Sequence, residues 1–294
     1  MKRIAVVGVG LLGSAVASRL LSGGFTVAGY DTRPEQLTGL TSRGLQAASS
    51  LKDAATGADA VFTILPTPDA VEVAITGPGG LLGTMARSAA LIQMSTISPT
   101  LTRRLAEAAT GAGIAFLDAP MSGTSAMVER GDCTIFAGGD RALVDACQPI
   151  FAAIAKRTTH VGPVGSASLA KLAANLLVAL NTAALAEALV LGTKGGLPPQ
   201  VLLDILKDSA GASRMVDVRG PLMVEHRFEP QMKLELFLKD FRLMLEEAQR
   251  LGVALPLTSL TQQLCTAAVA AGRGGDDLAV VITTLEQMAG LGPA

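Results

Sequence analysis

The first half of the chain alternates short apolar runs with longer segments in which apolar and polar residues are mixed. Short apolar runs bounded by glycine, proline and polar residues predict β-strands, and the amphipathic segments between them predict helices. Strands are therefore expected at residues 4–7, 26–30, 60–65, 90–94, 115–117, 134–137 and 160–161, with helices at 11–22, 100–110 and 141–155. Strands that are apolar along their whole length are typical of a mostly parallel sheet that helices cover on both faces.

The second half of the chain lacks this alternation. From Ser166 to Lys194 the sequence is rich in Ala and Leu and contains no proline, which predicts one helix of roughly 40 Å at ~1.5 Å per residue. This helix is apolar nearly all round, so other elements must bury it. Further helices are expected at residues 200–209, 234–251, 257–271 and 279–288. The pattern predicts an α/β domain over residues 1–163 and an all-helical domain over residues 164–294, joined by the long helix.

Composition narrows the class of protein. Of the 294 residues, 49% are hydrophobic but only 3% are aromatic, so Ala, Leu, Val and Ile must build the core. A formal net charge of −1 argues against a nucleic-acid partner, which requires a basic face. Only 17% of the residues are charged and the mean hydropathy is +0.45, which indicates apolar surface buried in a homo-oligomer.

The cysteines and the N-terminal segment indicate the cellular compartment in which the protein is expected. Cys133, Cys147 and Cys265 have neither disulfide-framework nor zinc-ligand spacing, so a reducing, cytoplasmic location and no metal are expected. Met1 to Arg3 and the apolar run that follows imitate a signal peptide, but that interpretation does not explain the glycine spacing within the run. No other run has 18 uninterrupted apolar residues, so no membrane span is expected.

A glycine-rich turn follows the first expected strand and opens the first expected helix. In a dinucleotide-binding turn, the first glycine permits the tight bend, the second lets the backbone approach a pyrophosphate, and the third lets helix pack on strand. The motif predicts a Rossmann-type, doubly wound domain that binds NAD. Its residues are Gly8, Val9, Gly10, Leu11, Leu12 and Gly13.

Asp31 ends the second expected strand, close to the roughly 20 residues after the motif at which a carboxylate binds the ribose 2′-hydroxyl. A carboxylate there repels a 2′-phosphate and so favours NAD, while the nearby Arg33 leaves NADP possible. The alternative is that Asp31 is only a turn residue before Pro34.

Two further strand ends fit the same ligand, because ligands of open α/β sheets bind at the carboxyl ends of strands. Leu65 and Pro66 end one strand, and Thr96 follows the next. Thr96 has an alternative role as the N-cap of the helix that begins near Pro99.

Hydroxyl and amine groups mark a candidate substrate site. Ser122, Gly123 and Thr124 follow an apolar strand and can present N–H and O–H donors to a carboxylate, although they equally suit a polar turn. Lys171 and Asn175 share one face of the long helix. A buried lysine there suits proton transfer, and the alternative is a lysine that reaches from the first turns of the helix into solvent.

These motifs occur together in an order that resembles the β-hydroxyacid dehydrogenase family, of the 3-hydroxyisobutyrate dehydrogenase-like type. They are the glycine turn, the Asp118–Thr124 loop, Gly162–Gly165 followed by Lys171 and Asn175, and Phe237–Asp240. The similarity spans nearly the whole chain.

The resemblance implies an NAD(P)-dependent enzyme that oxidises the hydroxyl of a small, anionic β-hydroxy acid. It makes Lys171 the catalytic acid and base and assigns Lys239 to the cofactor. It also implies a homodimer or homotetramer built on the helical half. The residues implied to bind the substrate are Ser122, Gly123, Thr124, Asn175 and Asp240.

One departure leaves the substrate open. Many family members carry Ser-Gly-Gly where this chain has Ser122, Gly123 and Thr124, and the threonine side chain narrows the pocket and adds a hydroxyl. The alternatives are a reductase of a small semialdehyde, such as tartronate or succinic semialdehyde, an imine reductase, or a non-catalytic NAD(P)-binding scaffold. Lys171 favours alcohol chemistry, because family members that reduce imines generally lack that lysine.

Overall fold

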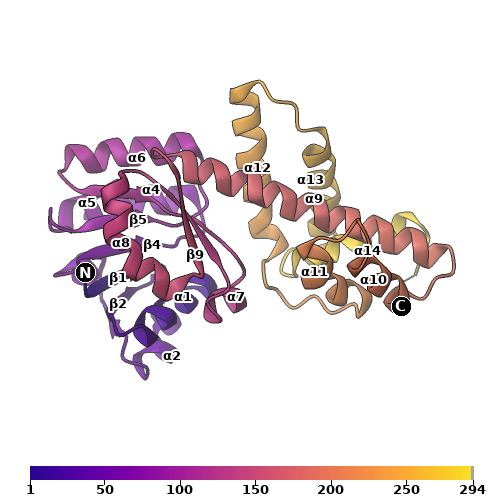
Figure 1. The fold of residues 1–294 in the computed structure, drawn as a ribbon, viewed down its shortest axis with the longest axis horizontal. Helices are drawn as coiled ribbons and strands as arrows, with labels where there is room; N and C mark the ends of the chain where they lie inside the picture. Colours follow the sequence, from indigo (N-terminus) through magenta and orange to yellow (C-terminus); the bar gives the residue numbers. More distant parts are fainter. Residues whose placement is uncertain (293–294) are drawn as a thin grey trace. The chain divides into compact units, whose positions relative to one another are not determined.

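The computed structural model describes residues 1–292 and divides the chain into two compact units (Figure 1). The first unit extends from Met1 to Lys171, and the second begins at Leu172. Helix α9 (Ser166–Lys194) is continuous through this boundary, as the sequence predicted. The first unit is α/β and the second is helical, which confirms the predicted fold class.

Within the described residues, the first unit is built on one nine-stranded sheet. Its strands are β1 (Arg3–Val7), β2 (Thr26–Tyr30), β3 (Gln46–Ala47), β4 (Ala60–Thr63), β5 (Ala90–Gln93), β6 (Ala115–Asp118), β7 (Met121–Ser122), β8 (Thr134–Gly138) and β9 (Arg157–Gly162). Strands β3, β2, β1, β4, β5 and β6 are parallel and adjacent in that order. Strand β8 pairs antiparallel with β6 and β7 and parallel with β9. The carboxyl ends of β1, β4, β5 and β6 therefore lie along one edge.

Helices cover both faces of this sheet because its central strands are apolar on both sides (Figure 1). In β1, Ile4 and Val6 pack into one core, whereas Ala5 and Val7 pack into the other. The first core includes residues of η1 (Pro34–Leu37), α1 (Leu11–Ser22), α2 (Thr38–Thr41), α7 (Ser125–Glu129) and α8 (Arg141–Ile154). The second includes residues of α3 (Leu51–Ala55), α4 (Pro68–Thr76), α5 (Leu81–Thr84) and α6 (Pro99–Gly111).

Several boundaries differ from the sequence prediction. Strands β4 and β5 end at Thr63 and Gln93, before the predicted positions 65 and 94. Beyond these ends, backbone groups of Leu65 and Ser95 form hydrogen bonds with side chains. Strands β3 and β7 were not predicted, since two residues are too few to show a period. Strand β9 begins three residues before the predicted position 160.

Helix α9 is long and apolar enough to cross a membrane by length and composition, and it alone meets that test among the described residues. Its most apolar 18-residue window has a mean hydropathy of 1.7, and 39% of that window is buried. The core helix of a globular protein meets the same test. In the second unit, α9 contributes Leu172, Ala179, Leu185, Ala186, Leu189 and Val190 to the hydrophobic core.

The second unit packs further helices on α9. They are α10 (Pro199–Lys207), α11 (Arg214–Val224), α12 (Leu234–Leu251), α13 (Pro256–Ala268) and α14 (Val281–Met288), with the short turns η2 (Val269–Arg273) and η3 (Leu278–Val280). Helix α11 was not predicted, because Gly220 and Pro221 lie inside it and both disfavour a helix interior. The helix predicted to reach residue 271 ends at Ala268 and continues as a π-turn.

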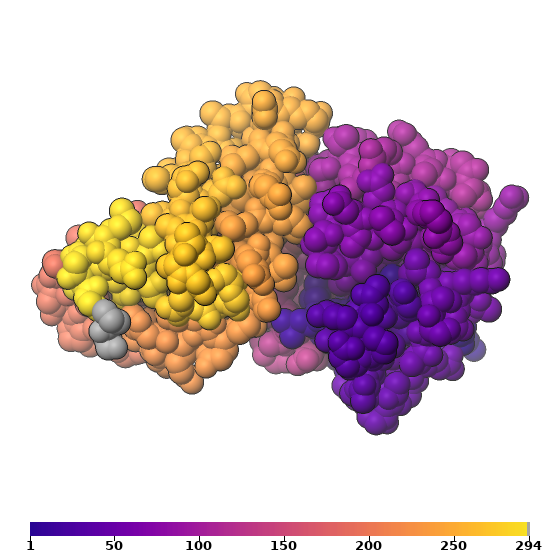
Figure 2. Space-filling model, turned by 180° about the vertical axis from the view of Figure 1, so that it is seen from behind, coloured from indigo at the N-terminus to yellow at the C-terminus, as the bar shows by residue number. Residues whose placement is uncertain are grey.

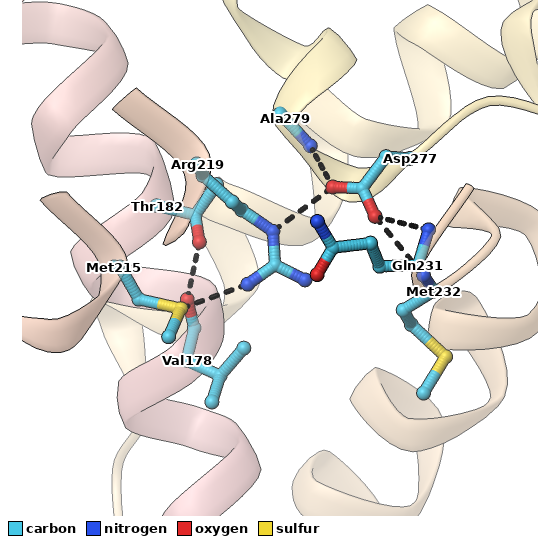
Figure 3. A network of polar contacts seen from close by, with 8 residues as sticks. All are labelled: Val178, Thr182, Met215, Arg219, Gln231, Met232, Asp277 and Ala279. Carbon is cyan, nitrogen blue, oxygen red and sulfur yellow. Dashed lines mark hydrogen bonds and ion pairs between the residues drawn. The ribbon is translucent and has the colours of Figure 1, made fainter. Parts of the chain in front are cut away.

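A buried ion pair holds the segment that leads into α12 (Figure 3). Asp277 Oδ1 accepts hydrogen bonds from Arg219 Nε at 3.1 Å and from the Ala279 N–H at 3.0 Å. Asp277 Oδ2 accepts from the N–H groups of Gln231 and Met232, both at 3.0 Å. The Arg219 and Asp277 side chains are only 4% and 0% exposed, so each buried charge depends on the other.

Candidate functional site

The glycine turn joins β1 to α1, and each of its glycines lies in a different environment. Gly8 has φ +90°, and a Cβ there would lie 2.2 Å from the Ile64 carbonyl oxygen. A Cβ on Gly13 would lie 1.9 Å from the Gly8 oxygen, so packing requires both glycines. At Gly10 the nearest atom to such a Cβ, among residues 1–292, is Arg33 Nη2 at 4.0 Å. The backbone at Gly10 therefore borders an open cradle at the start of α1, which fits a bound pyrophosphate.

Asp31 follows β2 and holds the glycine turn. Its Oδ2 accepts the Val9 N–H at 2.9 Å, and its Oδ1 accepts the Arg33 N–H at 3.0 Å. The Arg33 Nε lies 3.7 Å from the same Oδ1, with the arginine side chain 62% exposed. The aspartate that was predicted to bind the ribose therefore contacts the turn that was predicted to bind the pyrophosphate.

Ser95 connects the ends of β4 and β5. Its hydroxyl accepts the Leu65 N–H at 2.8 Å and donates to the Thr63 carbonyl oxygen at 3.3 Å. The Gln93 side chain in turn binds the backbone of Ser95, with Nε2 2.8 Å from its carbonyl oxygen and Oε1 2.5 Å from its N–H. The clamp fixes Leu65, a predicted cofactor contact, at the edge of the sheet.

The other two residues predicted at these strand ends lie in the loops. Pro66 is exposed after β4, and Thr96 is half-buried after β5. The N-cap of α6 is Ser98, whose hydroxyl accepts the Leu101 N–H at 3.1 Å. The alternative role of Thr96 as that cap was therefore wrong.

The candidate substrate loop starts at the end of β7. Ser122 is half-buried, and Gly123 has φ +151° with a Cβ position 2.8 Å from Cys133 Cβ, so a larger residue is disfavoured there. The Thr124 hydroxyl accepts the Met127 N–H at 3.3 Å as the N-cap of α7. Part of the hydrogen-bonding capacity of Thr124 thus stabilises a helix.

Lys171 is 9% exposed and lies in the second turn of α9. The first turn of that helix is bound to Asp118 at the end of β6. Asp118 Oδ2 accepts the N–H groups of Gly165 at 3.1 Å and Ser168 at 2.8 Å, and Oδ1 accepts the Ser168 hydroxyl at 2.8 Å. Complete burial raises the pKa of the Asp118 carboxyl above its ordinary value, and these hydrogen bonds oppose that rise.

In the second unit, three of the predicted site residues meet. Asn175 Nδ2 donates to Asp240 Oδ2 at 2.7 Å, and Lys239 Nζ lies 3.0 Å from Asp240 Oδ1. Asn175 is 3% exposed and Asp240 is 4% exposed. The cluster joins α9 to α12 through residues 65 positions apart in the sequence.

The sequence prediction did not find the roles of Gln93, Ser95 and Asp118. All three are buried polar residues at the carboxyl ends of adjacent parallel strands. A polar residue directly after an apolar run was the available signal, but such a residue also suits a surface turn. The partner groups, which lie elsewhere in the sequence, make the difference.

Two family descriptions match the chain. Residues 3–162 match the NAD binding domain of 6-phosphogluconate dehydrogenase. Residues 165–285 match the family described as NAD-binding of NADP-dependent 3-hydroxyisobutyrate dehydrogenase. The two matches meet near the start of α9 and together cover most of the chain.

Whole proteins are similar over the same length. The 2-(hydroxymethyl)glutarate dehydrogenase of Eubacterium barkeri is 34% identical over 290 residues, covering 98% of this chain and 96% of that protein. The NAD-dependent L-serine dehydrogenase of Pseudomonas aeruginosa is 33% identical over 288 residues, covering 96% and 97%. The crystal structure of a 3-hydroxyisobutyrate dehydrogenase from Salmonella typhimurium has a TM-score of 0.89 at 29% identity, covering 96% of this chain and 99% of that one.

Proposed function

Because the chain belongs to the β-hydroxyacid dehydrogenase family, we propose that it oxidises the hydroxyl-bearing carbon of a small β-hydroxy acid with Lys171 as the proton acceptor. Membership makes the protein an NAD(P)-dependent hydroxyacid dehydrogenase.

The cofactor preference rests on Asp31. The open cradle at Gly10 fits the pyrophosphate of either dinucleotide, since no side chain at that position fills it. The Asp31 carboxylate at the adjoining ribose position accepts hydrogen bonds from a free diol and repels a phosphate. NAD is therefore the proposed cofactor, and the exposed Arg33 guanidinium is the group that allows some use of NADP.

Lys171 is the proposed general base. Bound NAD⁺ supplies the hydride acceptor for the substrate carbon. The Lys171 amine accepts the proton of the substrate hydroxyl, and in the reverse direction it returns that proton. Ser122 and the backbone around Gly123 bind the substrate carboxylate through O–H and N–H donors. Asn175 and Asp240 are the further proposed substrate residues, and Lys239 the further proposed cofactor residue.

The observation that carries the proposal is the burial of Lys171 on α9. A lysine is rarely buried without a partner or a task, because removing an ammonium group from water is costly. A general base must accept a proton in its uncharged form, and this is the form in which Lys171 is proposed to act. The residue lies three positions after Ser168, the contact of Asp118, so its helix turn is held in place.

The substrate proposal follows from the names of the similar proteins. The similar proteins named above act, by their names, on hydroxymethylglutarate, serine and hydroxyisobutyrate. The three acids each carry a hydroxyl near a carboxylate, and a compound of that class is proposed here. Measuring NADH formation from a panel of 3-hydroxy acids, including hydroxyisobutyrate, glycerate, serine and threonate, tests the class. Turnover of none of them in either direction would contradict it.

A homodimer or homotetramer is proposed from the exposed apolar surface. Large apolar side chains remain open on α9, α10 and α13, including Leu177 at 57%, Val201 at 51% and Leu260 at 59%. The end of α12 and the turn after it, which form part of the gold surface in Figure 2, add Leu251 and Val253. Light scattering that gave the mass of a single chain would contradict this.

The buried, free state of all three cysteines within residues 1–292 supports a reducing, cytoplasmic compartment.

Replacing Lys171 tests the enzymatic proposal. In Lys171→Ala we expect kcat to fall by about 10²–10⁴-fold, because the proton has no acceptor, while NADH still binds. Steady-state kinetics and NADH fluorescence measure the two effects. The matched control is Lys194→Ala, which removes the exposed lysine at the other end of α9. An active Lys171→Ala variant would remove this lysine from the mechanism.

A further inference from the structure

The N-terminus of α9 is capped by a residue from a distant strand. The first N–H groups of a helix have no partner within the helix and require an acceptor. For α9 that acceptor is the Asp118 carboxylate, which binds the N–H groups of Gly165 and Ser168. Asp118 precedes Gly165 by 47 positions and Ser168 by 50 positions in the sequence. A negative group at this end of a helix is favourable because it faces the positive end of the helix dipole.

The same aspartate belongs to the segment that carries the candidate substrate loop. Asp118 ends β6, and after Ala119 and Pro120 the chain forms β7, which ends at Ser122. In the other direction, Lys171 follows Ser168 by less than one helical turn. One buried side chain therefore ties the helix of the proposed base to the strand of the proposed carboxylate-binding loop.

We propose that Asp118 is a positioning residue that sets the placement of Lys171 relative to the Ser122 loop. The inference rests on the proposed function, since it assumes that Lys171 and the loop act on one substrate. Asp118 is fully buried, and its side chain accepts hydrogen bonds from Gly165 and from Ser168 of α9, so its effect on the reaction passes through the start of this helix. A change of about 1 Å in the position of a reacting group can cost on the order of 10²-fold in rate.

The hydrogen-bond partners of Asp118 indicate which substitution preserves the hydrogen bonds at the start of α9. Oδ2 faces two N–H groups and must stay an acceptor, but Oδ1 faces the Ser168 hydroxyl, which can donate or accept. The Ser168 hydroxyl is also 2.8 Å from the Thr102 hydroxyl, which lies 3.0 Å from the Ser98 carbonyl oxygen. Asparagine can therefore keep its oxygen on the helix N–H groups and donate to Ser168, which then donates to Thr102.

The experiment compares Asp118→Ala with Asp118→Asn in the full-length protein. We expect kcat to fall by about 10–100-fold in Asp118→Ala and to stay within about threefold of the wild type in Asp118→Asn. The Kd for NADH should stay within about twofold in both, because Asp31 is held by the N–H groups of Val9 and Arg33, whereas Asp118 binds Gly165 and Ser168. Unchanged kcat in Asp118→Ala, or equal losses in the two variants, would overturn the proposal.

The matched control is Asp140→Ala. Asp140 is the exposed N-cap of α8 in the same unit and accepts the Leu143 N–H at 2.9 Å. Its loss removes a helix cap of the same chemical kind, so a kcat equal to that of the wild type shows that capping loss alone does not slow the reaction. An equal fall in kcat in Asp140→Ala and Asp118→Ala would overturn the positioning role.

A readout other than activity separates this inference from the proposed function. Hydrogen exchange of the amides in residues 165–172 should be faster in Asp118→Ala and unchanged in Asp118→Asn, whatever the reaction. Faster exchange together with a fully active Lys171→Ala variant would contradict the proposed function but leave the anchoring intact. Unchanged exchange in Asp118→Ala would contradict the anchoring itself. Should Asp118→Ala fail to fold, Ser168→Ala provides the same comparison, with kcat expected to fall about 3–10-fold, and wild-type kcat would overturn the proposal.

Discussion

Two buried aspartates, one in each unit, hold backbone segments in place by different means. Asp118 binds two backbone N–H groups and one hydroxyl group. Asp277 binds three N–H groups and the guanidinium of Arg219. Both side chains are 0% exposed, so water does not replace any of these partners.

The difference lies in whether the partners can reverse their roles. A hydroxyl can donate or accept, so one oxygen of Asp118 can be replaced by an NH₂ group. Backbone N–H groups and guanidinium groups can only donate, so neither oxygen of Asp277 can be replaced without opposing two donors. Asparagine is therefore compatible with position 118 and incompatible with position 277.

The largest expected effect is that of Asp277→Asn. The substitution leaves the buried Arg219 charge unpaired and points an NH₂ group at obligate donors, so we expect a loss of about 3–5 kcal/mol in the free energy of unfolding. Chemical denaturation measures it, with Asp118→Asn as the matched substitution in the other unit. Equal stability of the two variants would remove the distinction between the sites.

Asp31 is a third carboxylate that extends the comparison to the cofactor. Both of its oxygens accept backbone N–H groups, as in Asp277, but its neighbourhood is only partly buried, so solvent can compensate. In Asp31→Asn we expect the ratio of kcat/KM for NADP to that for NAD to rise about tenfold, or ~1.4 kcal/mol, because the repulsive charge is lost. Kinetics with both cofactors measure this ratio.

Arg33→Ala serves as the counterpart, because it removes the nearby cation and should lower the use of NADP. An unchanged cofactor ratio in Asp31→Asn would exclude Asp31 as the determinant of preference.

The smallest expected effect is a pH-dependent difference between Asp118→Asn and the wild type. Burial raises the folded-state pKa of Asp118, so the folded protein binds this proton more tightly than the unfolded chain. The stability from that proton is fully present below the ordinary pKa of 3.8 and is lost as the pH rises through the folded-state pKa. Asp118→Asn lacks this loss.

Unfolding measured from about pH 3 to pH 8 tests this sign, since the variant should gain stability relative to the wild type as the pH rises from 3.8 through the folded-state pKa, and the difference should then stay constant. A relative stability that changed in the opposite direction would mean that the hydrogen bonds to Asp118 outweigh its burial.

Local patterns in the sequence were sufficient for much of the fold. The glycine turn, the extent of α9 and the boundaries of α1 were predicted, because helix and strand periods and the special conformations of glycine act over a few neighbouring residues. The same local logic failed at α11, where Gly220 and Pro221 suggested a break that the packing of the helical unit overrides.

The candidate site divides in the same way. The positions of Lys171 and Asn175 on one helix face, and of Asp31 after the second strand, follow from spacing alone. Resemblance to a family supplied the proposed roles of Lys239 and Asp240, and the structure added the cluster that these two residues form with Asn175.

Short-range sequence patterns are enough to locate most strands and helices, the dinucleotide turn and the residue types available for the chemistry. Only the tertiary structure decided that Asp118 meets the start of α9 and that Asp277 meets Arg219, 58 positions away. The physical reason is that such hydrogen bonds depend on the closure of long loops, and nothing in the residues next to an aspartate states which distant donor will face it.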